Sequence, residues 1–256
     1  MQVAEHLPYL CNELKLPTVK AHWDEVANMA RKDGLTYGDF LAKLLDLELT
    51  VKEQNKLERM IRVSKLQPAK TLSTFNFTEL KMVNQCQIEQ FANNSDWVMN
   101  KENLILFGPS GVGKTHLACA IGYQQIQQGM KVLFTKTTLL VQALQAAKAD
   151  LKLKKELDRL GKFDLLILDD MGYVKKTEQE TSVLFELIES RYETGSVIIT
   201  ANQAFNEWNK IFPDPVMAVA AVDRLIHHAT IIEFDEDSYR RKQYKTNNTE
   251  SEELKD

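Results

Sequence analysis

One eight-residue segment constrains the fold of this chain more than any other. Residues 108–115 read Gly-Pro-Ser-Gly-Val-Gly-Lys-Thr and fit the pattern G-x-x-x-x-G-K-[ST]. The apolar run NLILF directly precedes them, and the helix-like run HLACAIGYQQIQQ directly follows. This strand–loop–helix context is the one in which the pattern binds phosphate, whereas a chance match at the four fixed positions is expected in roughly 1% of chains. The segment therefore predicts a phosphate loop within an α/β core.

The chemistry of such a loop assigns roles to its residues. Its glycines let successive backbone N–H groups point at phosphate oxygens, and the following helix adds the partial positive charge of its N-terminus. Lys114 is expected to reach the β- and γ-phosphates, and the Thr115 hydroxyl is expected to hold Mg²⁺. The predicted cofactor-binding residues of this segment are Gly108, Pro109, Ser110, Gly111, Val112, Gly113, Lys114, Thr115 and His116.

Two acidic residues end another apolar run, FDLLILDD. In phosphoryl-transfer sites one carboxylate orients the magnesium shell and a second activates the attacking water. We assign Asp169 to the metal and Asp170 to the general base. A lone Asp after a strand is commonly a solvated turn residue. Two acids after four apolar residues, in a chain with a phosphate loop, favour the catalytic interpretation.

Two further polar residues are candidates for catalysis. Asn202 follows the run SVIIT, at the edge where open α/β sheets bind ligands, and is expected to position the lytic water together with Thr200. The alternative is a turn former, the more common role of such an Asn. Arg224 comes late in the helical segment before the last apolar run. Such an arginine is normally a surface or salt-bridge residue, but it can stabilise transition-state charge, in cis or from a neighbouring subunit. The predicted catalytic residues are Lys114, Asp170, Asn202 and Arg224, whereas His227 and His228 lack a third metal ligand and are interpreted as polar contacts.

The distribution of apolar residues predicts an α/β protein with a helical N-terminal region. Five short runs, NLILF, KVLFT, FDLLILDD, SVIIT and ATIIEF, alternate with helical segments, which indicates a five-stranded, doubly wound parallel sheet flanked by helices. Apolar spacings of i, i+3 and i+4 predict three helices in the N-terminal region, the second near 18–31 and the third near 37–62. The predicted segments are a helical N-terminal domain (1–66), a docking linker (67–80), the α/β core (81–245) and a disordered tail (246–256).

The distribution of charge narrows the possible partners. The chain has 32 Lys+Arg and 36 Asp+Glu, a formal charge of −4, which argues against a protein that coats nucleic acid by bulk positive charge. The charge is uneven, because residues 49–70 hold six basic and two acidic side chains, residues 136–162 seven and three, and residues 233–256 five and eight. The two basic runs favour contacts with a DNA backbone, although a solvated charged face is the common alternative. The predicted nucleic-acid contacts are Lys52, Lys56, Arg59, Arg62, Lys152, Lys154 and Lys155.

The cysteines and the absence of long apolar runs predict the compartment. Cys11, Cys86 and Cys119 are odd in number and lack C-x-x-C spacing, which is typical of buried thiols in a reduced environment. No basic stretch followed by an apolar one opens the chain, and no run approaches the roughly 18 apolar residues of a membrane span. We therefore expect a cytoplasmic protein that does not span a membrane.

The motifs in their order along the chain resemble a known family. The phosphate loop, LLILDD, the strand end TAN and the segment DRLIHH are similar to the AAA+ ATPases of the IstB and DnaC-like group, over nearly the whole chain. The resemblance implies ATP and Mg²⁺ as cofactors, with Asp169 and Asp170 as the Walker B acids. It also implies that Asn202 is sensor 1 and that Arg224 is an arginine finger acting on ATP bound to the adjacent subunit. The small C-terminal lid of many AAA+ proteins is expected to be absent.

The same resemblance extends to segments outside the motifs. It places Phe75 and Phe77 of the linker near the adenine, and it gives Arg240 the position of a sensor-2-like arginine. The stretch 136–162 is long enough for two helices where a minimal crossover needs one. This matches the extra helix by which initiator and loader relatives bind nucleic acid.

The resemblance also implies a function. The pieces TANQAFNEW, VDRLIHHATIIEF and DSYR look closer to a transposition helper ATPase than to a loader. A helper would oligomerise on duplex target DNA through its N-terminal domain, hydrolyse ATP, and deliver the target site to a transposase. The alternative is a replicative helicase loader acting in DNA replication. A small-molecule kinase is a third class, for which the chain shows no acceptor-binding motif.

Overall fold

The structure is a computed structural model of the 256-residue chain and describes residues 3–79, 83–171, 177–202 and 215–235. The chain forms two compact units, Met1–Arg59 and Met60–Asp256. The predicted four-segment division stays a prediction. Its tail (246–256) lies outside the described residues, as do Arg240 and the region where a lid would follow. Within the described ranges, no helix combines the length and apolar character needed to cross a membrane.

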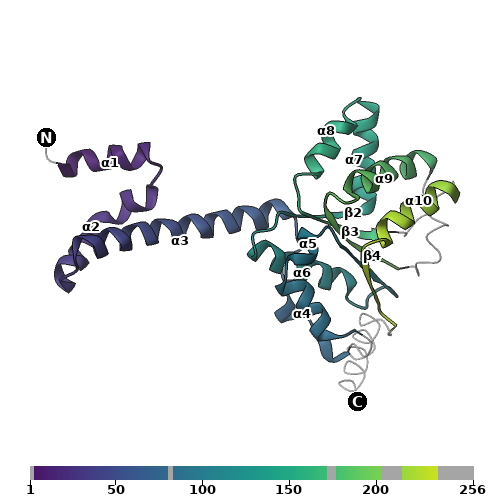
Figure 1. The fold of residues 1–256 in the computed structure, drawn as a ribbon, viewed down its shortest axis with the longest axis horizontal. Helices are drawn as coiled ribbons and strands as arrows, with labels where there is room; N and C mark the ends of the chain where they lie inside the picture. The colour runs from purple at the N-terminus through teal and green to yellow at the C-terminus, as the bar shows by residue number, and fades with distance from the viewer. Residues whose placement is uncertain (1–2, 80–82, 172–176, 203–214, 236–256) are drawn as a thin grey trace, which may run out of the picture. The chain divides into compact units, whose positions relative to one another are not determined.

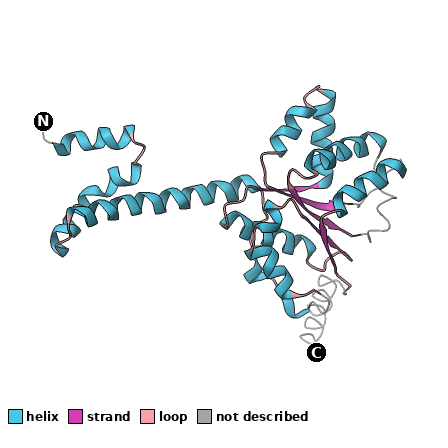
Figure 2. Cartoon of the chain, viewed as in Figure 1, coloured by secondary structure: helices cyan, strands magenta, loops and turns pink. Residues whose placement is uncertain are grey.

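A five-stranded parallel sheet forms the centre of the second unit (Figure 2), as predicted. Its strands are β1 (Asn103–Phe107), β2 (Val132–Lys136), β3 (Leu165–Met171), β4 (Ser196–Ala201) and β5 (Ala229–Glu233), in the spatial order β2-β3-β4-β1-β5. Leu104, Ile105 and Leu106 of β1 are fully buried. This continuous apolar run is typical of a parallel strand whose two faces are both covered.

Helices cover both faces of this sheet (Figure 1). On one face α6 (Lys114–Gln127) contacts β1 to β4 and packs against α4 (Gln85–Asn93), while the short α5 (Asp96–Met99) contacts β4. The other face carries α7 (Thr137–Ala149), α8 (Leu153–Leu160), α9 (Glu178–Arg191) and α10 (Pro215–Ile226). The chain reverses direction across the sheet after β2, and right-handed crossovers therefore place α6 and α7 on opposite faces. The two helices expected between the second and third strands are α7 and α8.

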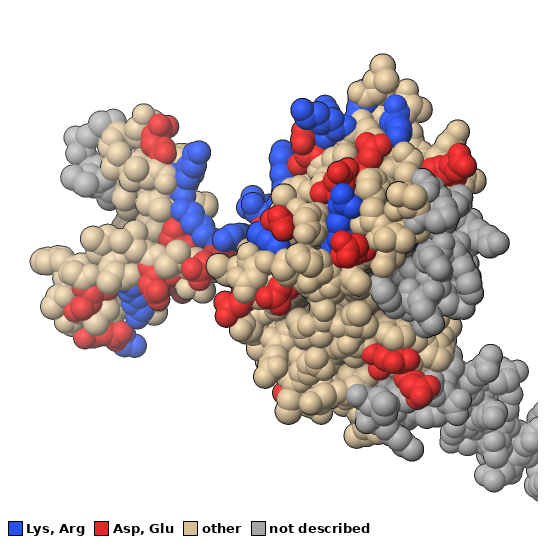
Figure 3. Space-filling view, turned by 45° about the vertical axis from the view of Figure 1, so that its right-hand side comes forward, with Lys and Arg blue, Asp and Glu red and all other residues tan. Residues whose placement is uncertain are grey.

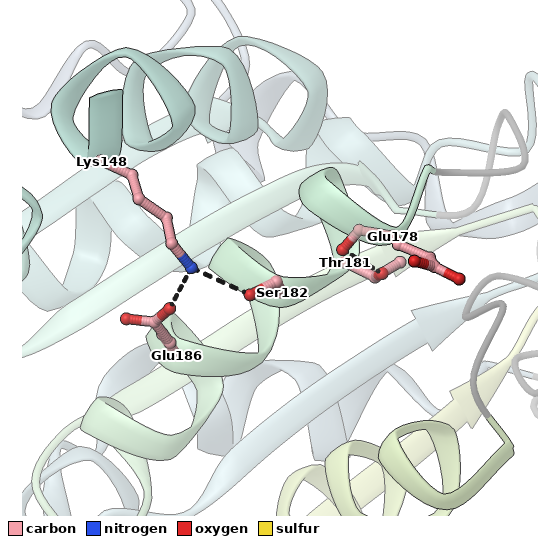
Figure 4. A network of polar contacts seen from close by, with 5 residues as sticks. All are labelled: Lys148, Glu178, Thr181, Ser182 and Glu186. Atoms are coloured by element: carbon pink, nitrogen blue, oxygen red, sulfur yellow. Dashed lines mark hydrogen bonds and ion pairs between the residues drawn. The ribbon is translucent and has the colours of Figure 1, made fainter. Parts of the chain in front are cut away.

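A polar contact joins α7 to α9 (Figure 4). Lys148 Nζ lies 2.7 Å from Glu186 Oε1 and donates to Ser182 Oγ at 3.0 Å. Near the start of α9, Thr181 donates a hydrogen bond to the carbonyl oxygen of Glu178 at 3.0 Å. Lys148 is one of the basic residues of 136–162, but its ammonium is paired with Glu186. Part of the positive charge of this stretch therefore joins α7 to α9.

The first unit is built from helices, as predicted. They are α1 (Val3–Glu13), α2 (Pro17–Asp33) and α3 (Tyr37–Ser64), and α3 continues into the second unit. Glu48 of α3 is buried and accepts the N–H groups of Thr18 and Val19, at 2.8 and 2.9 Å. Burial alone would raise the pKa of this carboxyl, but the two backbone hydrogen bonds and Lys52 lower it below its ordinary value. Glu48 thereby satisfies N–H groups that the first turn of α2 leaves free.

One expectation about the cysteines is wrong. Cys11 and Cys119 are buried thiols, but Cys86 is exposed on the first turn of α4. Its position next to the cap of this helix explains the exposure, because Asn84 accepts the N–H of Cys86 at 2.9 Å at the solvent-facing end. The sequence spacing of the cysteines carries no information about which helix face each one occupies.

Candidate nucleotide site

The phosphate loop connects the end of β1 to the first turn of α6. Gly113 caps α6 with φ of 102°, and Gly108 leaves β1 with φ of 144°. Both values lie in the region that side chains with a Cβ disfavour. A Cβ on Gly108 would also overlap the carbonyl oxygen of Phe234, the residue after β5. The glycines are required here by backbone conformation and by the close approach of another chain segment.

A pair of glycine substitutions tests this packing. Gly108→Ala is expected to lower the free energy of unfolding by about 2 kcal/mol more than Gly129→Ala, because overpacking typically costs 1–3 kcal/mol. Gly129 is the matched control, since it also has a positive φ, 89°, but its added Cβ would meet nothing within 4 Å. Urea unfolding of both variants measures the difference. Equal destabilisation would contradict the close approach of Phe234.

Lys114 and Thr115 open α6, directly after the phosphate loop. The Lys114 ammonium donates hydrogen bonds to the carbonyl oxygens of Gly108 and Pro109, both at 2.7 Å. Thr115 donates its hydroxyl to Asp169 Oδ1 at 2.7 Å, which joins the start of α6 to the end of β3. Asp169 is 2% exposed. Thr115 and Asp169, the two residues predicted to hold the metal, therefore lie next to each other.

Thr200 connects the two acids to the neighbouring strand. Its hydroxyl donates to Asp169 Oδ1 at 2.7 Å and accepts the backbone N–H of Asp170 at 2.9 Å. Asp170 has φ of 58°, and the register of β3 with β4 shifts between Leu168 and Met171. Such an irregularity redirects a side chain at the end of a strand. Thr200 therefore holds the two acids in place, a contact that the sequence did not predict, while its suggested part in positioning the water stays a prediction.

The linker places an aromatic cluster beside the phosphate loop. The Phe75 ring is edge-on to Phe77, with centroids 4.8 Å apart, and to His116, with centroids 5.1 Å apart. A Cβ on Gly113 would lie 2.8 Å from the Phe75 ring, so the cluster touches the loop itself. His116 Nε2 lies 3.0 Å from the carbonyl oxygen of Thr71 and must carry the proton, because a carbonyl only accepts. Burial lowers the pKa of His116, which favours the neutral ring.

Residues of the phosphate loop, the two acids and His116 line one cavity of about 460 Å³ at the carboxyl edge of the sheet, whereas Phe75 and Phe77 are not among its lining residues. Its lining residues are Gln67, Lys70, Ser110, Gly111, Gly113, Lys114, Thr115, His116, Lys136, Asp169, Asp170 and Asn202. Hydroxyl and carboxylate oxygens next to a lysine and a glycine-rich loop fit a magnesium-bound nucleoside triphosphate. The sequence missed Gln67, Lys70 and Lys136. Of these, Lys136 ends β2 beside Asp169, and the strand-end rule that found the acids could also have found it.

Arg224 lies away from this cavity. Its guanidinium donates to the carbonyl oxygen of Ala220 at 3.0 Å and sits 5.3 Å from the centroid of the Phe185 ring, with Glu189 Oε1 at 4.0 Å. It lies at the C-terminal end of α10 near the start of β1, since it lines a small recess with Asn103. That is the amino edge of the sheet, opposite the phosphate loop of the same chain. The position argues against action in cis.

The remaining residues predicted to have polar roles are the two histidines and the basic residues expected to contact nucleic acid. His227 Nδ1 lies 3.1 Å from the Tyr192 hydroxyl, and the His227 and His228 rings are tilted against each other with centroids 4.1 Å apart. All seven predicted nucleic-acid contacts are exposed. Two of them are partly engaged, because Lys52 pairs with Glu48 at 3.4 Å and Lys152 with Asp150 at 3.2 Å. Basic and acidic side chains alternate on the face shown in Figure 3.

The sheet order, the phosphate loop and the acid pair define a P-loop nucleotide-binding protein of the AAA+ class. The chain belongs to the family of IstB-like ATP binding proteins, which it matches over residues 10–247.

Several of its relatives are ATP-binding proteins of insertion sequences. It is 49% identical to an insertion sequence ATP-binding protein of Sinorhizobium fredii over 236 residues, 92% of this chain and 79% of the relative. It is 37% identical to the corresponding protein of insertion sequence IS5376 of Geobacillus stearothermophilus, covering 92% of this chain and 94% of the relative.

Solved structures share the fold. A DnaC helicase loader aligns with a TM-score of 0.53 and 21% identity, over 65% of this chain and 97% of the loader. AMPPCP-bound DnaA from Aquifex aeolicus aligns with a TM-score of 0.53 and 21% identity, over 73% of this chain and 56% of DnaA. The identities are low, and the likeness therefore concerns the fold.

Proposed function

We propose that this protein is an ATPase that assists DNA transposition. The observation that carries the proposal is the joining of Thr115, Asp169 and Thr200 by hydrogen bonds beside the phosphate loop, in a chain whose relatives are insertion-sequence ATP-binding proteins. The reaction is attack of water on the γ-phosphate of ATP. Such catalysis rests mainly on positioning and on stabilising charge.

The residues of the site divide the work. Lys114 exchanges the carbonyl oxygens of Gly108 and Pro109 for phosphate oxygens, which are stronger acceptors because they are charged. Thr115 and Asp169 hold Mg²⁺, which when bound neutralises charge on the phosphates.

The remaining residues act on the water and on the neighbouring subunit. Asp170 accepts the proton of the attacking water, and Asn202 orients that water. The linker aromatics Phe75 and Phe77 contact the adenine. Arg224 reaches ATP bound to an adjacent subunit, because its own phosphate loop lies at the other edge of the sheet. Hydrolysis therefore depends on assembly.

We further propose that the assembled protein binds duplex DNA in the cytoplasm and delivers it to the transposase of the same element. Residues 1–66 serve as the DNA- or partner-binding domain, 67–80 as the linker near the nucleotide, and 81–245 as the ATPase core. The exposed side chains Lys154 and Lys155 of α8, with the basic residues of α3, supply phosphate contacts. A single subunit has few such contacts, so affinity grows with the number of linked subunits.

DNA binding at defined salt tests this proposal. Binding of a random-sequence duplex, followed by fluorescence anisotropy between 50 and 200 mM salt, is expected to be tighter with a non-hydrolysable ATP analogue than with ADP. The double variant Lys154→Gln/Lys155→Gln is expected to flatten the slope of log K against log salt by about 1.8, the loss of two phosphate contacts per subunit. Lys131→Gln, at another exposed lysine, is the matched control. A preference for single strands together with capture of a replicative helicase would support the loader alternative instead.

A further inference from the structure

Lys70 lines the nucleotide cavity although it lies in the linker, outside every motif of the sequence. Its ammonium has no hydrogen-bond or ion-pair partner among the residues that the structure describes. The side chain is half-buried. An unpaired cation in a cavity that fits a triphosphate is a candidate ligand for phosphate.

Two anchors fix the backbone on either side of Lys70. On the N-terminal side Leu66 is buried against α6, where a Cβ on Gly122 would lie 3.0 Å from Leu66 Cδ2. On the C-terminal side the carbonyl oxygen of Thr71 accepts from His116 Nε2 at 3.0 Å. Both anchors lie on α6, the helix that begins in the phosphate loop. Lys70 is therefore held relative to the loop.

A tight turn connects the first anchor to Lys70. The N–H of Lys70 donates to the carbonyl oxygen of Gln67 at 3.4 Å, and Ala69 at the third position has φ of 64°. Pro68 at the second position favours such a turn, in which the third residue takes a positive φ. Ala69 holds this conformation without the freedom of a glycine. The surrounding contacts, which include the Thr74 hydroxyl donating to the Ala69 carbonyl at 2.6 Å, keep the turn in place.

The surroundings of Cys119 show on which side of α6 Lys70 lies. Burial raises the pKa of the Cys119 thiol. The positive charge of Lys70 lowers this pKa and the negative charge of Asp169 raises it, so both charges lie near the thiol. Cys119 lies one turn beyond Thr115 on α6, so it marks the side of the helix that faces Asp169. The terminal phosphate belongs on this side, since Thr115 and Asp169 meet there. The adenine belongs beside Phe75.

We propose that Lys70 binds the terminal phosphate of ATP and thereby distinguishes ATP from ADP. This inference rests on the proposed function, because it takes the cavity to be the ATP site. Lys70 lies six residues after the end of α3. The linker that follows the N-terminal helices therefore carries the residue that distinguishes ATP from ADP. Lys70 belongs to the basic run of residues 49–70, but its charge binds the nucleotide rather than DNA.

Nucleotide affinities of matched variants test the inference. Lys70→Gln is expected to weaken binding of a non-hydrolysable ATP analogue about tenfold, as for loss of a charge-assisted hydrogen bond, and binding of ADP less than about twofold. Lys65→Gln is the control, since Lys65 lies five residues before Lys70 and is not among the residues that line the cavity. It is expected to change neither affinity. Lys70→Arg keeps the charge and is expected to recover most of the preference for ATP. Titration calorimetry in the presence of Mg²⁺ measures the affinities of the unsubstituted protein and of the three variants for both nucleotides.

The outcomes separate this inference from the proposed function. An unchanged ratio of ATP to ADP affinity in Lys70→Gln would overturn the inference while leaving the ATPase proposal intact. If both affinities fell equally, Lys70 would have a role in linker structure only. Failure of the unsubstituted protein to bind ATP would overturn both.

Discussion

Asp170→Asn is expected to lower the turnover number for ATP hydrolysis by about 10² to 10⁴-fold, the usual contribution of a general base, while ATP affinity changes little. The substitution removes the proton acceptor and keeps the shape of the side chain. It also preserves the backbone, because asparagine tolerates the positive φ of 58° at this position at least as well as aspartate. Steady-state phosphate release and ATP titration measure the two quantities.

The control for this experiment is Asp158→Asn, a substitution of an exposed aspartate on α8. It is expected to leave turnover unchanged. If Asp170→Asn retains more than half of the turnover, Asp170 is not the base. Asp170 would then have a structural role only, in which its N–H donates to Thr200 at the irregular end of β3.

Arg224→Ala is expected to lower turnover by about 10³-fold or more, the effect of removing an arginine finger, without loss of ATP binding. The reason is positional. Arg224 lies at the amino edge of the sheet, away from the phosphate loop of its own chain, so the proposed role requires a phosphate bound by another subunit. Its stacking on Phe185 and the nearby Glu189 hold the guanidinium in one place.

Two measurements support the interpretation of the Arg224→Ala result. ATP titration shows whether the nucleotide still binds, and thermal unfolding shows whether loss of the Phe185 contact destabilises α10. Arg31→Ala, an exposed arginine of α2, serves as the control and is expected to keep full turnover. Normal hydrolysis by Arg224→Ala would assign the residue to the packing of α9 and α10 instead.

Much of this fold could be predicted because its signals are local. Each strand is a continuous apolar run, as in β1, and the phosphate loop requires a strand before it and a helix after it. The approach of Thr115 to Asp169 also followed, because parallel strands end at the same edge of a sheet. The sequence therefore indicated which strand ends line this cavity.

The parts that were missed depend on tertiary contacts. The hydrogen bonds of Thr200 to the two acids lie next to the register shift between β3 and β4, and the order of apolar and polar residues does not reveal such a shift. Lys70 reaches the cavity only because Leu66 and Thr71 are anchored on α6. The exposure of Cys86 depends on which face of α4 turns to solvent. None of these contacts produces a repeating pattern of apolar and polar residues from which it could be predicted.

If one subunit completes the ATP site of the next, as proposed, a mixture of two inactive variants should show it. Lys114→Ala keeps the finger and lacks a working phosphate loop, whereas Arg224→Ala has the reverse defect. In a head-to-tail assembly, random mixing of equal amounts makes about one interface in four complete. The mixture is expected to regain ATP hydrolysis toward that fraction, while each variant alone stays inactive. No regain in a mixture shown by sedimentation to have co-assembled would rule out action of Arg224 on the neighbouring subunit.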